Sequence, residues 1–337
     1  MRRISWLALL AVVGFFLMAA PAAGADPVTL KFGTFVPPQA FDVVKVWNPL
    51  FQRIMKDSGG TVKIDTYAGS TLGRNPTQYP KLILDRVMDI GFSVNTYQPG
   101  RFPDDEIINI PFTTRGSMEA TVAFNRMIAK GVVRGYDNFI PLGVLCLYQY
   151  SIHTTFPVKT PEDMKGVKIQ VSGKLMQTFT EAYGAVPVGI GVTKLAETIN
   201  RGVVKGTIME WNALKQWRIL EVVPYHCMVP YGAIAISLLM NKDAFNELPP
   251  QAKAAFEKNI GEPFAKTWSE LYSARVMAIE EEVRNDPKHH IYTPTPSEME
   301  QWKAAIWPAV EKWKEENPKG KMLYDTYLSE LEKFRKE

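Results

Sequence analysis

Apolar and polar positions along the chain alternate in a way that predicts strands and helices in turn. In the first third, three strands are expected, over residues 28–33, 61–67 and 89–94. Apolar residues near helical spacing predict the helices that join them and one more downstream, over 41–56, 79–88 and 118–130. This βαβαβ order predicts a sheet with helices on its faces.

A strand is predicted over 144–153, and we expect it to cross between two halves of the molecule. A second series of alternating strands and helices follows it. Strands are predicted over 167–171, 185–188 and 206–210, and helices over 174–182 and 194–201. An apolar strand, 233–240, precedes a largely helical end with helices over 251–282 (interrupted softly around Gly261 and Pro263), 297–317 and 322–336. No flexible linker separates the halves, so we expect two lobes joined by several crossings.

The N-terminus has the pattern of an export signal. Arg2 and Arg3 precede an apolar run over 4–20, and Ala23-Gly24-Ala25 has the small-x-small form of a cleavage site. We therefore predict cleavage after Ala25 and exclude residues 1–25 from the fold. An uncleaved membrane anchor is the alternative. The remaining 26–337 segment is long for a single core and suits two lobes.

Charge and cysteine content narrow the class of protein. Cleavage would remove two positive charges and no acid, which lowers the formal net charge from +4 to +2. The remaining acids and bases are interspersed, so no nucleic-acid partner is predicted. Cys146 and Cys227 both lie in apolar, strand-like segments. An oxidising compartment would allow them to form a bridge, but buried free thiols are the simpler interpretation.

The sequence carries no recognised catalytic, metal or nucleotide motif. Its four histidines form no H-E-x-x-H pattern, and G-x-S-x-G, G-x-G-x-x-G and P-loop runs are absent. The run Asp104-Asp105-Glu106 is interpreted as a solvated turn rather than a cation site. We predict neither a cofactor nor a metal. A secreted hydrolase or lyase that works through carboxylates is the alternative of another class.

Several segments together resemble one family. They are Leu72-Gly73-Arg74, the run 159–170 (KTPEDMKGVKIQ), 183–188 (YGAVPV) and 202–206 (GVVKG). Their order is similar to that of the DctP-type solute-binding proteins of tripartite ATP-independent periplasmic (TRAP) transporters, over nearly the whole mature chain. The resemblance implies a two-lobed α/β periplasmic binding protein with crossing hinge strands and a long C-terminal helix that spans both lobes.

The resemblance also implies a function and a division of the chain. Lobe I is expected over 26–147 and 236–275, and lobe II over 148–235 and 276–337. The protein would be a periplasmic receptor and no enzyme. It would capture a small organic acid, for example an aromatic or keto acid, by cleft closure, and deliver it as a monomer to the integral-membrane subunits of a TRAP permease. A receptor for a neutral or zwitterionic polar solute is the alternative.

Three polar positions depart from the family's pattern. Gln170 stands where the family usually has an arginine that clamps a carboxylate, Lys194 where glutamate is common, and Lys205 where aspartate is common. An amide offers only neutral hydrogen bonds, which are weaker than the charged fork of a guanidinium. Either another cation binds the carboxylate, or the solute is neutral or zwitterionic, or Gln170 points elsewhere. The candidate substitutes are Arg74, Arg86 and Arg101, with Lys174 at a helix start as a further contributor.

Other candidate ligand contacts follow from position. Trp211 and Asn212 come directly after the strand over 206–210, and ligands bind at such carboxyl ends in α/β folds. Phe35 and Tyr148 or Tyr150 are candidates by the same logic. Tyr97 and Arg101 lie in a segment that resembles the family's cleft mouth, where Arg101 either contacts solute or fixes the turn. Trp211 is either a cleft wall or a core residue.

Overall fold

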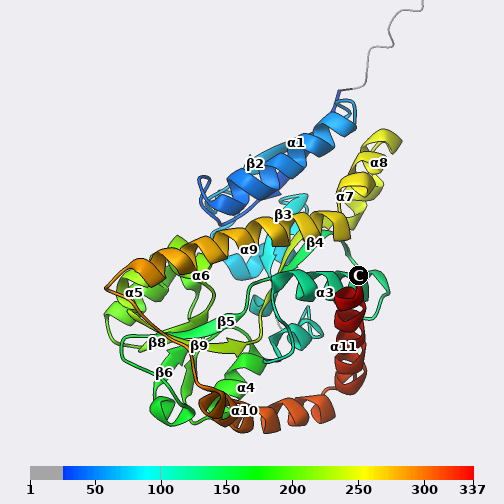
Figure 1. Ribbon diagram of the computed structural model, residues 1–337. Coiled ribbons are helices and arrows are strands. Elements are labelled where there is room, and N and C mark those ends of the chain that lie inside the picture. Colours follow the sequence, from blue (N-terminus) through cyan, green and yellow to red (C-terminus); the bar gives the residue numbers. More distant parts are fainter. Residues whose placement is uncertain (1–25, 99) are drawn as a thin grey trace, which may run out of the picture.

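The computed structural model describes residues 26–98 and 100–337, so the predicted export signal lies outside the described residues. The chain forms two α/β lobes, each built on its own sheet (Figure 1). The first sheet has strand order β2-β1-β3-β10-β4, and the second β11-β9-β5-β8-β6-β7. The predicted two-lobed α/β fold is confirmed.

The first sheet contains β1 (Val28–Gly33), β2 (Val62–Tyr67), β3 (Ile90–Val94), β4 (Phe139–Cys146) and β10 (Ala235–Asn241). Its helices are α1 (Asn48–Asp57), α2 (Tyr79–Leu84), α3 (Ser117–Ala129), α7 (Lys242–Asn246) and α8 (Pro250–Asn259). Strand β1 is parallel to β2 and β3, whereas β10 is antiparallel to β3 and β4. The helix predicted over 41–56 is divided, because a π-helical segment, Asp42–Trp47, precedes α1.

The second sheet contains β5 (Tyr150–Thr154), β6 (Lys168–Gln170), β7 (Val186–Val188), β8 (Gly206–Met209), β9 (Tyr225–Tyr231) and β11 (His290–Tyr292). Its helices are α4 (Lys174–Ala182), α5 (Leu195–Asn200), α6 (Trp211–Gln216) and α10 (Pro296–Glu316). Helix α10 begins at a capping box in which Thr295 and Glu298 satisfy each other's backbone N–H groups. Helix α6 begins immediately after β8, which places its first turn at the carboxyl end of that strand.

Two short crossings connect the lobes. The segment predicted as one strand over 144–153 is in fact two, β4 in the first sheet and β5 in the second. The return crossing runs from β9 to β10, and the two crossings are hydrogen bonded to each other through Leu147 N and Ile234 O at 3.0 Å. A Cβ atom at Gly232 would lie 2.0 Å from the backbone oxygen of Asn109, so this crossing requires glycine.

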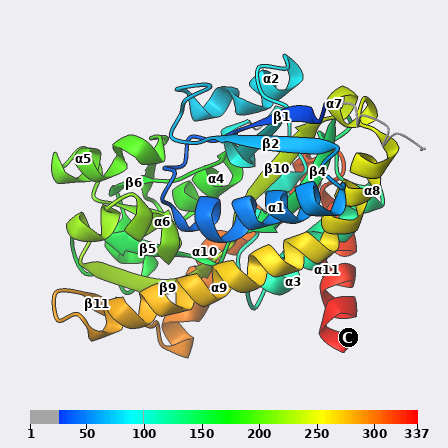
Figure 2. The same cartoon turned by 90° about the horizontal axis from the view of Figure 1, so that it is seen from above.

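Helix α9 (Glu262–Asn285) is the third link between the lobes. Figure 2 shows it running from α8, beside the first sheet, to β11, beside the second. It packs against β4 and α3 in one lobe and α6 in the other. The helix predicted over 251–282 is interrupted at Gly261, whose φ of 76° lies in the region that favours glycine, and becomes α8 and α9.

The C-terminal helix α11 (Gly320–Lys336) packs against α3, as Figure 1 shows near the marked C-terminus. The division at residues 147/148, 235/236 and 275/276 stays a prediction. Because α11 packs against α3, its contacts would place it in the lobe of the first sheet. Within residues 26–98 and 100–337, no helix is both long and apolar enough to cross a membrane.

Candidate functional site

A cavity lies between the two lobes, at the carboxyl ends of strands from both sheets. Its inner chamber has a volume of about 70 Å³. The first lobe and the crossings contribute Phe35, Val36, Asp42, Phe92, Val94, Tyr97, Leu147, Ile234 and Ile236. The second lobe and α9 contribute Tyr150, Ser172, Val192, Met209, Glu210, Asn212, Ala213, Gln216, Trp217 and Tyr272. Ligand sites of α/β folds are found at this kind of position.

An outer chamber of about 520 Å³ adjoins the inner one. Tyr97, Ser172 and Val192 line both chambers. Two cations line only the outer one, Arg74 and Lys194, and both are exposed. Neither forms an ion pair with any residue in the described part of the chain. The outer chamber therefore presents free positive charge.

One wall of the inner chamber is aromatic. The rings of Phe35 and Trp217 are stacked, with centroids 6.3 Å apart and planes at 24°. Phe92, which also lines the chamber, packs against Phe35 with ring centroids 5.4 Å apart. Trp217 follows the last residue of α6 and was not among the residues predicted to contact solute. The wall suits a flat apolar group on a solute.

Glu210 is a buried carboxyl at the start of α6 and lines the inner chamber. It caps the helix by accepting hydrogen bonds from the backbone nitrogens of Asn212 at 2.5 Å and Ala213 at 2.7 Å. The Tyr272 hydroxyl donates to it at 2.6 Å. Burial raises the pKa of Glu210 to about 7, and the charge of Asp42 acts in the same direction.

Asp42 is the second buried carboxyl of the inner chamber, and the π-helical segment carries it there. Trp268 on α9 donates its Nε1–H to Asp42 at 3.3 Å. Burial raises the pKa of Asp42 to about 6, although Arg275 partly opposes the shift. Neither acid was predicted from the sequence. Glu210 precedes Trp211 at the same strand end, which was an available signal, whereas nothing in the sequence around Asp42 distinguished it.

Several predicted site residues do line the cavity. Phe35, Tyr150 and Asn212 line the inner chamber, Arg74 the outer one, and Tyr97 lines both. They come from both lobes, so the fold brings together residues that are far apart in sequence. Their contact with solute stays a prediction.

Gln170 lines neither chamber, although its neighbour Val171 lines the outer one and Ser172 both. Its Nε2 donates to Ser172 Oγ at 3.2 Å and to Ile190 O at 3.1 Å. Its Oε1 accepts from the Thr207 hydroxyl at 2.5 Å. The amide is thus held within the second lobe. It links the carboxyl end of β6 to β8 and to the segment that follows β7.

Trp211 is buried and also lines neither chamber. Its ring packs against His153 at 4.9 Å and His226 at 4.8 Å. His153 Nε2 bonds to the carbonyl oxygen of Met209, so it carries a proton, and His153 Nδ1 then accepts from His226 Nδ1 at 2.8 Å. Burial lowers the pKa of His153 to about 3, which keeps this ring neutral.

Three of the basic residues that were predicted as candidate carboxylate contacts lie away from the two chambers. Arg101 lines a separate hollow with Gln98, Gly135 and Asp137, which Tyr97 also borders. Lys174 lines another hollow, beside Glu106 and Trp313. Arg86 is paired with Asp89 at 3.2 Å and with Glu247 at 3.1 Å. The two cysteines are free and buried, with Cys146 in β4 of the first sheet and Cys227 in β9 of the second.

The chain's similarities to known proteins agree with this architecture. The profile of the bacterial extracellular solute-binding proteins, family 7 (DctP), matches residues 32–317. The chain belongs to this family. The C4-dicarboxylate-binding periplasmic protein DctP of Rhodobacter capsulatus is 23% identical over 76% of this chain and 77% of its own. The 2,3-diketo-L-gulonate-binding periplasmic protein YiaO of Escherichia coli is 21% identical over 74% of this chain and 76% of its own.

Solved structures of TRAP solute-binding proteins share the fold. A marine metagenome protein specific for aromatic acid ligands, solved with 3-hydroxybenzoate, has a TM-score of 0.84, 25% identity, and coverage of 92% of this chain and 99% of its own. A Rhodoferax ferrireducens protein solved with benzoate has a TM-score of 0.85, 23% identity and the same coverages. This DctP-family chain is therefore a periplasmic solute-binding receptor of the TRAP type, which works with membrane permease components, and it is not an enzyme.

Proposed function

We propose that this receptor captures a small organic acid in the cavity between its lobes, and that aromatic carboxylates are the first class to test. The observation that carries the proposal is the combination of a stacked Phe35–Trp217 wall in the inner chamber with free cations, Arg74 and Lys194, in the adjoining outer chamber. The 3-hydroxybenzoate bound by the marine metagenome relative supports the same class.

In this proposal the carboxylate contact has moved from the family's usual position to the outer chamber. Gln170 is occupied by bonds to Ser172, Ile190 and Thr207, so its amide is not available to a solute. Arg74 belongs to the first lobe and Lys194 to the second. A carboxylate held between them would favour approach of the lobes, because both cations gain a partner only in the closed state.

The volume of the inner chamber indicates where the ring of an aromatic solute would lie. An apolar cavity that holds a benzene ring has a volume of roughly 150 Å³. The inner chamber, at about 70 Å³, is smaller than this. A ring would therefore lie across the junction of the two chambers or enter as the lobes separate, with its carboxylate directed toward Arg74.

We infer cleavage after Ala25, which would release a 26–337 receptor into the periplasm as a monomer that passes its solute to the permease. Mass spectrometry of the exported protein and its elution volume on a sizing column test these two points.

Calorimetric titration of the mature protein with benzoate, 3-hydroxybenzoate and succinate tests the carboxylate contact. We expect Arg74→Ala to weaken binding of the preferred acid at least about tenfold, because a charge-assisted contact is lost. Arg101→Ala is the matched control, since Arg101 lines a different hollow, and it should change affinity less than about twofold. A larger loss with Arg101→Ala than with Arg74→Ala would overturn the proposed position of the carboxylate.

A further inference from the structure

Three side chains with acceptor oxygens, Asp42, Glu210 and Asn212, line the inner chamber. Among the described residues, Trp268 is the only side chain that donates to Asp42. Asn212 is 4% exposed, and its Oδ1 accepts no hydrogen bond within residues 26–98 and 100–337. The orientation of this amide is fixed because its Nδ2 donates to the Tyr272 hydroxyl at 3.3 Å. The Tyr272 hydroxyl accepts this hydrogen bond because it donates its own proton to Glu210.

Within residues 26–98 and 100–337, no lysine or arginine lines this chamber. The cation that acts electrostatically on Asp42 is Arg275, one turn beyond Tyr272 on α9. Its guanidinium lies over the ring of Phe41, 5.9 Å from the centroid, and it is not among the lining residues. Two buried carboxyls therefore share one small cavity without a counter-charge inside it. Such an arrangement is costly unless a partner supplies positive charge.

The backbone is also irregular where it delivers Asp42 to the cavity. The segment Asp42–Trp47 is π-helical, whereas the residues that follow it continue as a regular helix. π-Helical turns are rare in proteins. Those that do occur are often found at functional sites. This irregularity and the unpartnered Asn212 oxygen are independent of the acidic character of the cavity, and both point to a ligand at this end.

We propose that Asp42, Glu210 and Asn212 form a subsite for a protonated amino group, so that the solute is an organic acid with an ammonium group at its inner end. The inference rests on the proposed function, which places the carboxylate in the outer chamber. An ammonium group has three donors and no acceptor, which matches the two carboxyls and the free amide oxygen. A chamber of about 70 Å³ holds such a group together with a short carbon arm.

The distribution of charge along the cavity also supports a solute whose ammonium group lies in the inner chamber and whose carboxylate lies in the outer one. Arg74 and Lys194 line the outer chamber, whereas Asp42 and Glu210 line the inner one. A zwitterion with separated charges would meet opposite charges at both ends. Burial raises the pKa of Asp42 to about 6 and that of Glu210 to about 7, and a bound ammonium group would favour their ionised forms.

Two pairs of compounds test the subsite, each differing only in the group that would reach it. We would titrate the mature protein with 3-(aminomethyl)benzoate against 3-(hydroxymethyl)benzoate, and with 5-aminopentanoate against 5-hydroxypentanoate, at pH 8. The amino member of at least one pair should bind about tenfold tighter or more. Asp42→Asn should remove most of that preference, and Glu210→Gln, checked for folding by circular dichroism because Glu210 caps α6, should reduce it.

Asp65→Asn is the matched control, since Asp65 lies on β2, outside both chambers, and pairs with Lys63 at 3.0 Å. It should leave the preference unchanged. Equal affinity for the two members of each pair would overturn the subsite while leaving an acid receptor intact. Binding of benzylamine as tight as that of 3-(aminomethyl)benzoate would support the subsite and reject the proposed carboxylate contact. Binding of none of these compounds would reject the subsite as proposed.

Discussion

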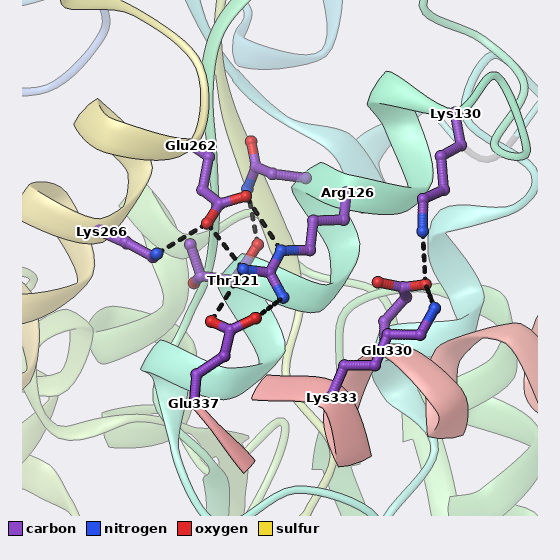
Figure 3. Close-up of polar contacts among 9 residues, drawn as sticks. Thr121, Arg126, Lys130, Glu262, Lys266, Glu330, Lys333 and Glu337 are labelled. Carbon is purple, nitrogen blue, oxygen red and sulfur yellow. Dashed lines mark hydrogen bonds and ion pairs between the residues drawn. The ribbon is translucent and has the colours of Figure 1, made fainter. Parts of the chain in front are cut away.

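Acidic side chains are treated in opposite ways in two regions of this receptor. Where α3, α9 and α11 meet, Arg126 lies between Glu262 at 3.0 Å and Glu337 at 2.7 Å, as Figure 3 shows. Beside it, Lys130 and Lys333 both contact Glu330, at 2.6 and 2.7 Å. In the inner chamber, by contrast, Asp42 and Glu210 have no lysine or arginine beside them among the described residues that line it.

The pKa values of the two groups of acids move in opposite directions. The hydrogen bonds from Arg126 lower the pKa of Glu262 and of Glu337. Burial raises the pKa of Asp42 and of Glu210. The paired acids attach α9 and the C-terminal helix to α3, so they serve folding. The unpaired acids oppose folding, which is the usual condition of groups that are kept for a ligand.

The largest expected effect comes from neutralising a cavity acid. Asp42→Asn should raise the free energy of unfolding by about 2 kcal/mol at pH 8. A rise of the pKa from 3.8 to about 6 corresponds to about 3 kcal/mol of ionisation cost, from which the weakened bond to Trp268 is subtracted. Urea denaturation of the solute-free protein measures it. A less stable variant would show that Asp42 already has an adequate partner.

The same variant has a pH dependence with a definite sign. Between pH 3.8 and about 6 the folded state holds a proton on Asp42 that the unfolded state has lost, so this group lowers stability as the pH rises through that window. The advantage of Asp42→Asn should therefore be full above pH 7 and vanish near pH 4. An advantage that is constant across this range would contradict the raised pKa.

A smaller effect of opposite sign is expected at the helix junction. Arg126→Met keeps an unbranched apolar stem but leaves Glu262 and Glu337 without their shared partner. Because the Arg126 side chain is only 19% exposed, we expect a loss of about 1 kcal/mol of stability. Arg201→Met is the control, since its pair with Glu197 is exposed, and it should cost less than about 0.5 kcal/mol. Equal losses in the two variants would place Arg126 in the same class as surface pairs.

The smallest expected effect is that of salt. Raising the ionic strength to about 1 M shortens the screening length to roughly 3 Å, which weakens partly exposed pairs more than buried charges. The stability difference between wild type and Arg126→Met should shrink by a few tenths of a kcal/mol, whereas that of Asp42→Asn should stay nearly constant. Parallel urea titrations at low and high salt measure both. A salt effect that is larger at Asp42 would mean that solvent reaches this carboxyl freely.

The sequence predicted most of the fold because the elements carry strong local signals. Strand 28–33 and helix 174–182 were predicted with the bounds that the structure has. It missed the break of 144–153 into β4 and β5, since both strands are buried and only the change of sheet separates them. It also missed the π-helical turn at Asp42, whose carboxylate accepts a hydrogen bond from Trp268 on α9, a contact that local spacing does not record.

By itself, the sequence determined the family and the two-lobed α/β fold, because these depend on residue order and local pattern. Only the tertiary structure decided what surrounds each side chain. It turned Gln170 toward Thr207 and Trp211 toward two histidines, and it brought Asp42, Glu210 and Tyr272 into one cavity. These three residues are separated by long stretches of chain, and no local pattern records a contact that forms only when the lobes and α9 pack together.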